Sequence, residues 1–170
     1  QTRKDRLFGV TNGIDYNVWN PATDPHLPAR YSADDLSGKR ECKRVLQAEM
    51  KLPVRDVPLV GLVSRLVFQK GIDLIVDILP KLLDLDVQVV ALGSGDPSYQ
   101  TLLAGLSARY PGKLAVRLAF DEPLAHRVEA GADLFLMPSR YEPCGLNQLY
   151  SLRYGTVPVV RKTGGLADTV

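Results

Sequence analysis

The sequence predicts an α/β fold in which helices cover both faces of a Rossmann-like parallel sheet. From residue 57 on, short continuous apolar runs alternate about five times with longer segments whose apolar residues have helical spacing. Such runs are typical of strands buried on both faces, as in a parallel sheet with crossover helices. The chain has 170 residues, fewer than the ~250 of a closed eight-stranded barrel, so an open sheet is expected.

The first 30 residues are expected to form an irregular lead-in segment. They contain the turn-forming pairs Asn12-Gly13 and Asn20-Pro21, and further prolines follow. Such residues interrupt helices and strands and favour turns. A short apolar run at residues 7–10 is a candidate strand within this segment.

The regular elements follow from the spacing of the apolar residues. Residues 33–50 are polar and compatible with an exposed helix that ends before Pro53. In residues 71–85, apolar side chains such as Ile72, Ile75 and Leu79 recur at helical spacing. The predicted strands are residues 59–63, 87–92, 114–120, 134–137 and 157–160, and the predicted helices after them are residues 71–85, 97–110, 122–130, 145–154 and one that begins at 166.

The composition excludes several classes of protein. Hydrophobic residues make up 45% and charged residues 24% of the chain, which suits a globular domain rather than a disordered or fibrous one. The net charge is +2, too small to indicate a nucleic-acid partner. No stretch approaches the ~20 apolar residues of a membrane span, so neither a nucleic acid nor a membrane is expected as a partner.

The two cysteines, Cys42 and Cys144, have neither a disulfide framework nor the spacing of a zinc site. Two free thiols in a reducing compartment are the simplest interpretation. No other cluster of metal-ligating residues is apparent in the sequence, so metal-independent chemistry is expected.

A ligand site is expected where the parallel strands end, because open α/β sheets bind ligands outside the carboxyl ends of their strands. The first such loop, residues 64–71, contains Arg65 and Lys70. A planar guanidinium and a compact ammonium in front of a helix N-terminus suit a pyrophosphate. The alternative is that both are ordinary surface cations.

The next two loops are more ambiguous. Residues 93–97 read GSGDP, a weak match to the dinucleotide-binding GxGxxG pattern because Ser98 replaces the third glycine. A tight turn with Asp96 capping the next helix and Pro97 as its first residue explains them more simply. Phe120 lies at the carboxyl end of the third predicted strand, where it either stacks on a base or belongs to the core.

The densest polar loop follows the fourth predicted strand, at residues 138–148. Glu142 precedes a Pro-Cys-Gly turn, where it either accepts hydrogen bonds from sugar hydroxyls or pairs locally. The N–H groups of Cys144, Gly145 and Leu146 lie at the start of the predicted helix, where the helix itself leaves them without acceptors. They are therefore candidates to bind a hydroxyl or an anion.

The loop after the fifth strand contains Thr163, Gly164 and Gly165 just before another predicted helix, and could form a second nest for a phosphate or a sugar. Cationic, glycine-rich and acidic loops at several strand ends of one sheet together indicate a ligand with both a pyrophosphate and a hydroxyl-rich group. The residues therefore favour a nucleotide-sugar site.

Four segments resemble bacterial glycogen synthases and the related starch synthases. They are the NGID motif at residues 12–15 with the following Trp19, VSRLVFQKG at residues 63–71, PSRYEPCGLNQLY at residues 138–150, and KTGGLADTV at residues 162–170. Tyr141 and Asn147 stand where the family has Phe and Thr. The resemblance covers nearly the whole chain.

This resemblance implies a retaining glucosyltransferase with two Rossmann-like domains facing a cleft, the GT-B arrangement. Such an enzyme transfers glucose from ADP-glucose to the non-reducing end of an α-1,4-glucan and needs no cofactor beyond that donor. Residues 1–30 would be an interdomain lead-in. Residues 31–170 would be the nucleotide-sugar-binding C-terminal domain, truncated at its end.

The family's N-terminal domain is absent from this sequence. The expected partners are therefore the nucleotide-sugar donor, the α-glucan acceptor and the protein's own missing N-terminal domain. The isolated fragment is expected to be inactive, because acceptor positioning and exclusion of water need both domains. The expected location is the cytoplasm of a bacterium, or the plastid if the parent is a plant starch synthase.

The resemblance also assigns roles to individual residues. Arg65 and Lys70 would neutralise the diphosphate and stabilise the leaving ADP, and Glu142 would be the essential acidic residue near the glucose. The N–H groups at residues 144–146 would hold glucose hydroxyls. Phe120 would lie against the adenine, and Thr163, Gly164 and Gly165 would approach the phosphates or the sugar.

The sequence leaves two other functions open. One is an NAD-dependent oxidoreductase, which the absence of GxGxxG after the first strand argues against. The other is a non-catalytic module whose sheet binds a partner or a glucan.

Overall fold

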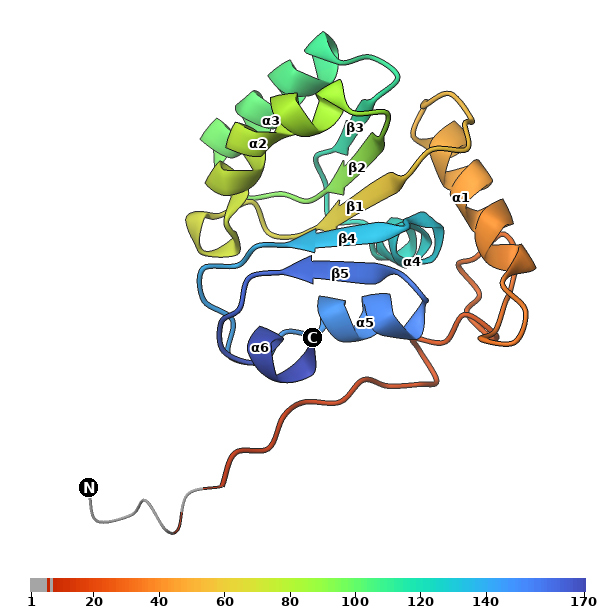
Figure 1. Cartoon of the computed structure of the whole chain (residues 1–170), viewed down its shortest axis with the longest axis vertical. Helices are drawn as coiled ribbons and strands as arrows, with labels where there is room; N and C mark the ends of the chain where they lie inside the picture. Colours follow the sequence, from red (N-terminus) through yellow and green to blue (C-terminus); the bar gives the residue numbers. More distant parts are fainter. Residues whose placement is uncertain (1–5, 7) are drawn as a thin grey trace.

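The computed structural model describes Arg6 and residues 8–170, and its centre is a five-stranded parallel sheet with the order β3-β2-β1-β4-β5 (Figure 1). This is the order of a Rossmann-type sheet, so the predicted fold class is confirmed. The strands are β1 (Leu59–Val63), β2 (Gln88–Leu92), β3 (Leu114–Arg117), β4 (Leu134–Met137) and β5 (Val157–Val160).

Helices cover both faces of the sheet, as predicted. α2 (Ile72–Asp84) and α3 (Pro97–Arg109) pack on one face, and α1 (Ser37–Glu49) and α4 (Glu122–Gly131) pack on the other. α5 (Asn147–Arg153) contacts α4, β4 and β5. A short 3-10 turn, η2 (Phe68–Lys70), precedes α2, and α6 (Leu166–Thr169) comes last.

The apolar runs are continuous because each central strand supplies both layers of the core. In β1, Val60 and Leu62 pack with α2 and α3, whereas Leu59 belongs to the cluster that contains α1 and α4. In β2, Val89 packs with α2 and α3, and Val90 belongs to the cluster that contains α1 and α4. Successive strand residues point to opposite faces, so a strand covered on both sides needs an apolar residue at every position.

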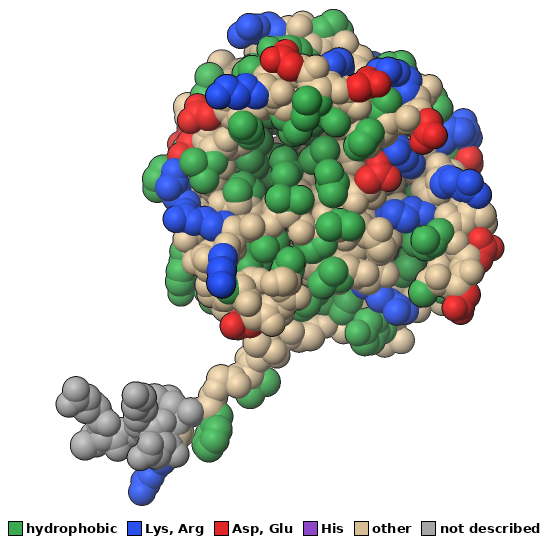
Figure 2. Space-filling model, viewed as in Figure 1, with side chains coloured by type: hydrophobic (Ala, Val, Ile, Leu, Met, Phe, Trp, Pro, Cys, Tyr) green, Lys and Arg blue, Asp and Glu red, His purple; other side chains and the backbone are tan. Residues whose placement is uncertain are grey.

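One face of the molecule keeps apolar side chains at its surface. Figure 2 shows hydrophobic side chains gathered near the middle of this face, with charged side chains around its margin. On the edge strand β5, Val157 and Val159 are exposed. In the part of the chain that the structure describes, no strand pairs with the outer edge of β5.

One predicted strand and the predicted bounds of two further elements, β3 and α5, are wrong. Residues 8–10 form no strand, and the adjoining Leu7 lies outside the described residues; Phe8 and Val10 are almost fully exposed, so these apolar side chains have no sheet to join. β3 ends at Arg117 rather than at residue 120. The Arg117 carbonyl accepts a hydrogen bond from Gly93 N at 3.1 Å.

The helix predicted from residue 145 begins two residues later, at Asn147. Gly145 has a φ of +79°, which lies in the left-handed region that a right-handed helix cannot contain.

The lead-in segment is irregular, as predicted, but aromatic side chains bind it firmly to the domain. Trp19 stacks between His126 of α4 and Tyr150 of α5, with ring centroids 3.7 Å apart in both pairs. Asp24 is buried, and its Oδ2 atom lies 2.7 Å from His126 Nδ1. The division of the chain at residue 30 stays a prediction.

Replacement of Gly61 by valine is expected to destabilise the fold. A Cβ atom at Gly61 would lie 2.9 Å from Val128 Cγ1 and 3.1 Å from Ala132 Cβ, so the variant overpacks the contact between β1 and α4 and should lose about 1–3 kcal/mol. The control is Gly105→Ala in α3, where nothing lies within 4 Å and a gain of about 0.5–1 kcal/mol is expected. Urea denaturation of both variants measures these changes, and a Gly61→Val protein as stable as the wild type contradicts the packing described.

Candidate functional site at the carboxyl ends of the strands

A cavity of about 650 Å³ lies where β1, β2 and β4 end. Its walls come from the loops after these strands, from the segment between β3 and α4, and from the start of α5. Trp19 and Asn12 of the lead-in also line it. A cavity therefore lies at the edge of the sheet where the sequence predicts a ligand site.

The loops after β1 and β2 are bound to each other through their backbones. Leu66 N donates to Ser94 O at 2.8 Å, and Asp96 N donates to Leu66 O at 2.8 Å. A Cβ atom at Gly93 would lie 2.0 Å from Ser64 O, so only glycine permits this approach. Asp96 caps α3 by accepting a hydrogen bond from Ser98 N at 2.8 Å, which confirms the simpler interpretation of this loop.

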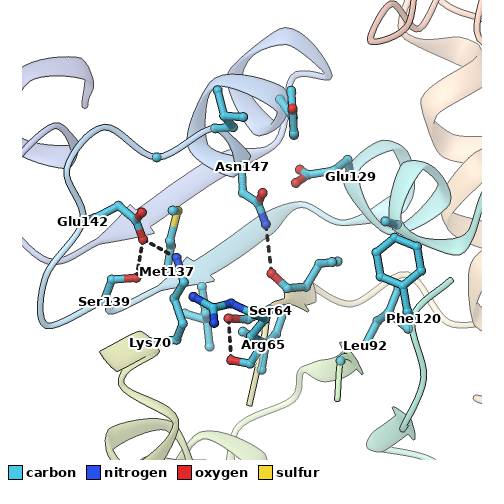
Figure 3. Close-up of a pocket in the computed structure, with 18 of the residues that line it drawn as sticks. Ser64, Arg65, Lys70, Leu92, Phe120, Glu129, Met137, Ser139, Glu142 and Asn147 are labelled. Atoms are coloured by element: carbon cyan, nitrogen blue, oxygen red, sulfur yellow. Dashed lines mark hydrogen bonds and ion pairs between the residues drawn. The ribbon is translucent and has the colours of Figure 1, made fainter. Parts of the chain in front are cut away.

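Lys70 and Glu142, which are 72 residues apart in the sequence, form an ion pair at one side of the cavity. Ser139 Oγ donates to the same carboxylate oxygen, Glu142 Oε2, at 3.2 Å. The side chains of Lys70 and Glu142 are 19% and 10% exposed. Figure 3 shows Lys70, Ser139 and Glu142 together, with Phe120 on the other side of the view and Arg65 between them.

Arg140 fixes the position of this pair. Its guanidinium pairs with Asp73 in the first turn of α2 and lies 4.2 Å from the centre of the Phe68 ring. Arg140 N also donates to Gln69 O at 2.8 Å. Since these contacts join the turn before α2 to the loop after β4, they hold Lys70 and Glu142 in register. The hydrogen bond from Arg140 lowers the pKa of the Asp73 carboxyl.

Arg65 and Phe120 both line the cavity with exposed side chains. Within the described residues the Arg65 guanidinium takes part in no ion pair. Phe120 is 90% exposed, which excludes the prediction that it belongs to the core. Both side chains are therefore available to a ligand.

The residues Cys144, Gly145 and Leu146 line the cavity just before α5. Their N–H groups have no acceptor within the described part of the chain, as expected from the sequence. Asn12 N lies 3.3 Å from Cys144 Sγ, so the lead-in covers this end of the cavity.

Thr163, Gly164 and Gly165 do not line the cavity, and the two glycines support the acidic loop from behind. Gly165 N donates to Glu142 O at 3.1 Å. A Cβ atom at Gly164 would lie 2.1 Å from the same carbonyl oxygen, and one at Gly165 would lie 2.4 Å from Cys144 Cα. Their contact with a ligand stays a prediction.

Several polar residues that line the cavity had no role predicted from the sequence, among them Glu129 and Asn147. Asn147 Nδ2 donates to Val63 O at 2.9 Å and so ties α5 to the end of β1. Burial raises the pKa of Glu129 to about 8. Glu129 lies within a helical stretch whose pattern gives no sign of a site.

Among Arg6 and residues 8–170, no group of three or more His, Cys, Asp or Glu side chains is placed to hold a metal ion. The same residues include no helix long and apolar enough to cross a membrane.

The chain belongs to the glycosyl transferases group 1 family, whose model matches residues 47–170. It is 64% identical to the glycogen synthase of Anaeromyxobacter dehalogenans strain 2CP-C over 96% of this chain and 35% of that protein. Glycogen synthase 1 of Geobacter metallireducens is 56% identical over 96% of this chain and 33% of that protein.

A solved structure agrees with these relatives. The catalytic domain of starch synthase IV from Arabidopsis thaliana, bound to ADP and acarbose, matches with a TM-score of 0.93 and 42% identity. The match covers 99% of this chain and 35% of that chain. The chain thus spans about a third of the length of these matched proteins.

The ion pair between Lys70 and Glu142 is expected to show energetic coupling. Lys70→Met leaves a largely buried carboxylate without its cation, and Glu142→Gln leaves the ammonium without its anion, so each change should cost about 1–3 kcal/mol. The double variant should lose less than the sum of the two, with a coupling energy of about 0.5–3 kcal/mol. Urea denaturation of the four proteins measures the cycle, and additive effects would show that the pair does not hold the loops together.

Proposed function

We propose that this chain is the donor-binding part of a glucosyltransferase of the glycogen and starch synthase type. The reaction is transfer of glucose from ADP-glucose to the non-reducing end of an α-1,4-glucan, with retention at the anomeric carbon. The observation that carries the proposal is the cavity itself, where the Arg65 guanidinium, the lysine–glutamate pair and three N–H groups meet, and among the described residues neither the guanidinium nor these N–H groups have a partner. The identity to glycogen synthases supports the choice of reaction.

Arg65 and Lys70 are proposed to bind the diphosphate and stabilise the charge that grows on the departing nucleotide. Preorganised cations at the point where charge develops lower the barrier most. Lys70 is held in place by its ion pair with Glu142, and Arg65 has no competing partner in the described residues. The leaving group would therefore meet one cation fixed by an ion pair and a second that no ion pair within the described residues holds.

Glu142 and the loop after it are proposed to bind the glucose. Its carboxylate has lone pairs left for sugar hydroxyls beside the contacts to Lys70 and Ser139. The N–H groups of Cys144, Gly145 and Leu146 supply donors at the same end. Thr163, Gly164 and Gly165 are proposed to approach the phosphates or the sugar only if this loop shifts, because they lie behind it.

Phe120 is proposed to stack on the adenine. Its ring lies on the opposite side of the view from Glu142, with Arg65 between them (Figure 3). The spatial order of the aromatic, cationic and acidic side chains across the cavity matches the order of base, diphosphate and sugar in the donor. The solved starch synthase has ADP bound, which supports adenine as the base.

The rest of the enzyme is proposed to supply what this chain lacks. Residues 1–30 would lead from an N-terminal domain into residues 31–170, and that domain would position the glucan acceptor and exclude water. The chain by itself would bind donor without elongating glucan. Beyond the donor, no cofactor is proposed.

Removal of the free cation is expected to weaken nucleotide binding. A hydrogen bond to a charged group contributes about 1.5–3 kcal/mol, so Arg65→Ala should bind ADP about 10- to 150-fold less tightly in calorimetry. Arg109→Ala removes the same charge from the last turn of α3, away from the cavity-lining residues, and should bind like the wild type. Equal binding by the wild type and Arg65→Ala refutes the assignment of Arg65.

Loss of the exposed ring is expected to affect binding and not folding. Stacking of a base on an aromatic side chain contributes about 1–3 kcal/mol, so Phe120→Ala should bind ADP about tenfold less tightly, while Phe120→Tyr keeps the affinity. The ring is 90% exposed, so the free energy of unfolding should not change. ADP titrations test the affinity, and urea denaturation tests the free energy of unfolding. Unchanged affinity in Phe120→Ala would place the base elsewhere.

A further inference from the structure

Glu129 of α4 is a buried carboxyl group at the cavity with no part in the function proposed above. Its side chain is 2% exposed and lines the cavity. In Figure 3 its carboxyl group points from α4 toward Asn147 at the start of α5. Within the described residues its carboxyl group has a single hydrogen-bond partner, Ser151 of α5, whose Oγ lies 2.7 Å from Glu129 Oε2.

The hydrogen bonds around Ser151 indicate which of these oxygens carries a proton. Ser151 Oγ lies within hydrogen-bond distance of two acceptors, Glu129 Oε2 at 2.7 Å and Asn147 O at 2.9 Å. A hydroxyl has a single proton to donate. If Glu129 were a carboxylate, one of these close contacts between oxygens would have no proton. If Glu129 is a carboxylic acid, it donates to Ser151, and Ser151 donates to the carbonyl of Asn147.

The surroundings of Glu129 favour the same state. Burial raises its pKa to about 8, against the opposing effects of the Ser151 hydrogen bond and the charge of Lys39. The Lys39 ammonium donates to Ala130 O at 2.9 Å and to Thr156 Oγ1 at 2.8 Å rather than to Glu129. The titratable groups that face Glu129 are Lys39 of α1, Tyr31 of the lead-in, Tyr150 of α5, and Tyr154 at its end.

We propose that Glu129 is a positioning residue that works as a neutral carboxylic acid, and that the proton it donates to Ser151 holds the first turn of α5 at the wall of the cavity. This turn begins at Asn147, which is bound to the end of β1 through Val63 O. The loop of residues 144–146 comes immediately before it. A fixed first turn therefore fixes the N–H groups that line the cavity.

A consequence follows for ligand binding, and it rests on the proposed function. Deprotonation of Glu129 would break its donation to Ser151 and place a negative charge in a cavity proposed to bind a diphosphate. Affinity for ADP should therefore fall as the pH rises through about 8.

The first experiment needs no ligand and compares the wild type with Glu129→Gln, whose amide N–H replaces the acid proton and does not ionise. The folded protein holds the proton of Glu129 above the ordinary pKa of 4.5, so the stability that Glu129 contributes is complete at low pH and is lost as the pH rises to about 8. The folding equilibrium constant of the wild type should fall relative to that of Glu129→Gln by about tenfold per pH unit between about pH 5 and 8.

Urea denaturation at several pH values measures this ratio. Glu122→Gln, which removes an exposed carboxyl from the same helix, is the matched control and should track the wild type. Infrared spectra of the wild type should show a protonated carboxyl band at pH 7 that disappears around pH 8. If Glu129→Gln does not fold, this band by itself decides whether Glu129 is protonated. A ratio independent of pH, or no such band, overturns the proposal.

The second experiment measures ADP affinity of the wild type and Glu129→Gln from pH 7 to 9. The wild type should lose affinity through pH 8 and the variant should not. Burial lowers the pKa of Lys39 to about 8 as well, but both proteins contain Lys39, so an equal loss in both would assign the effect to Lys39 and overturn the role of Glu129. Absence of ADP binding by either protein would contradict the proposed function, and the stability ratio would still decide the state of Glu129.

Discussion

The shape of the cavity depends on the ion pair between Lys70 and Glu142. Both side chains are largely buried, and the cost of removing each charge from water is offset only while the other stays in place. The pair therefore couples the turn before α2 to the loop after β4. Arg140 reinforces this coupling through Asp73 and through the backbone of Gln69. Protein contacts thus hold a cation and an anion in position, which reduces the ordering that ligand binding requires.

A second set of contacts supports the cavity from the side of the lead-in. Trp19 stacks between a side chain of α4 and one of α5, and Asp24 is buried against His126 and Tyr154. These contacts bind an irregular segment to the same two helices that hold Glu129 and Ser151. The position of α5 is therefore set by apolar stacking on one side and by a buried hydrogen-bond chain on the other.

The regular elements could be predicted because their signals are local. All five strands and the helices between them form where the apolar spacing placed them. The errors fall where a boundary depends on a distant neighbour or on a single backbone angle. Phe8 and Val10 are exposed to solvent and belong to no strand. Likewise, the left-handed φ of Gly145 delays α5 to Asn147.

The fold class and the edge of the sheet that carries the cavity follow from the sequence alone, because parallel strands bring all their carboxyl ends to one side. How the polar residues at this edge are paired and exposed depends on the packing of the folded chain. This packing paired Lys70 with Glu142, left Arg65 and Phe120 open to the cavity, and placed the loop of residues 163–165 behind it. It also buried Glu129 against Ser151. Burial and pairing are properties of packing between segments far apart in the chain, and local sequence patterns do not contain them.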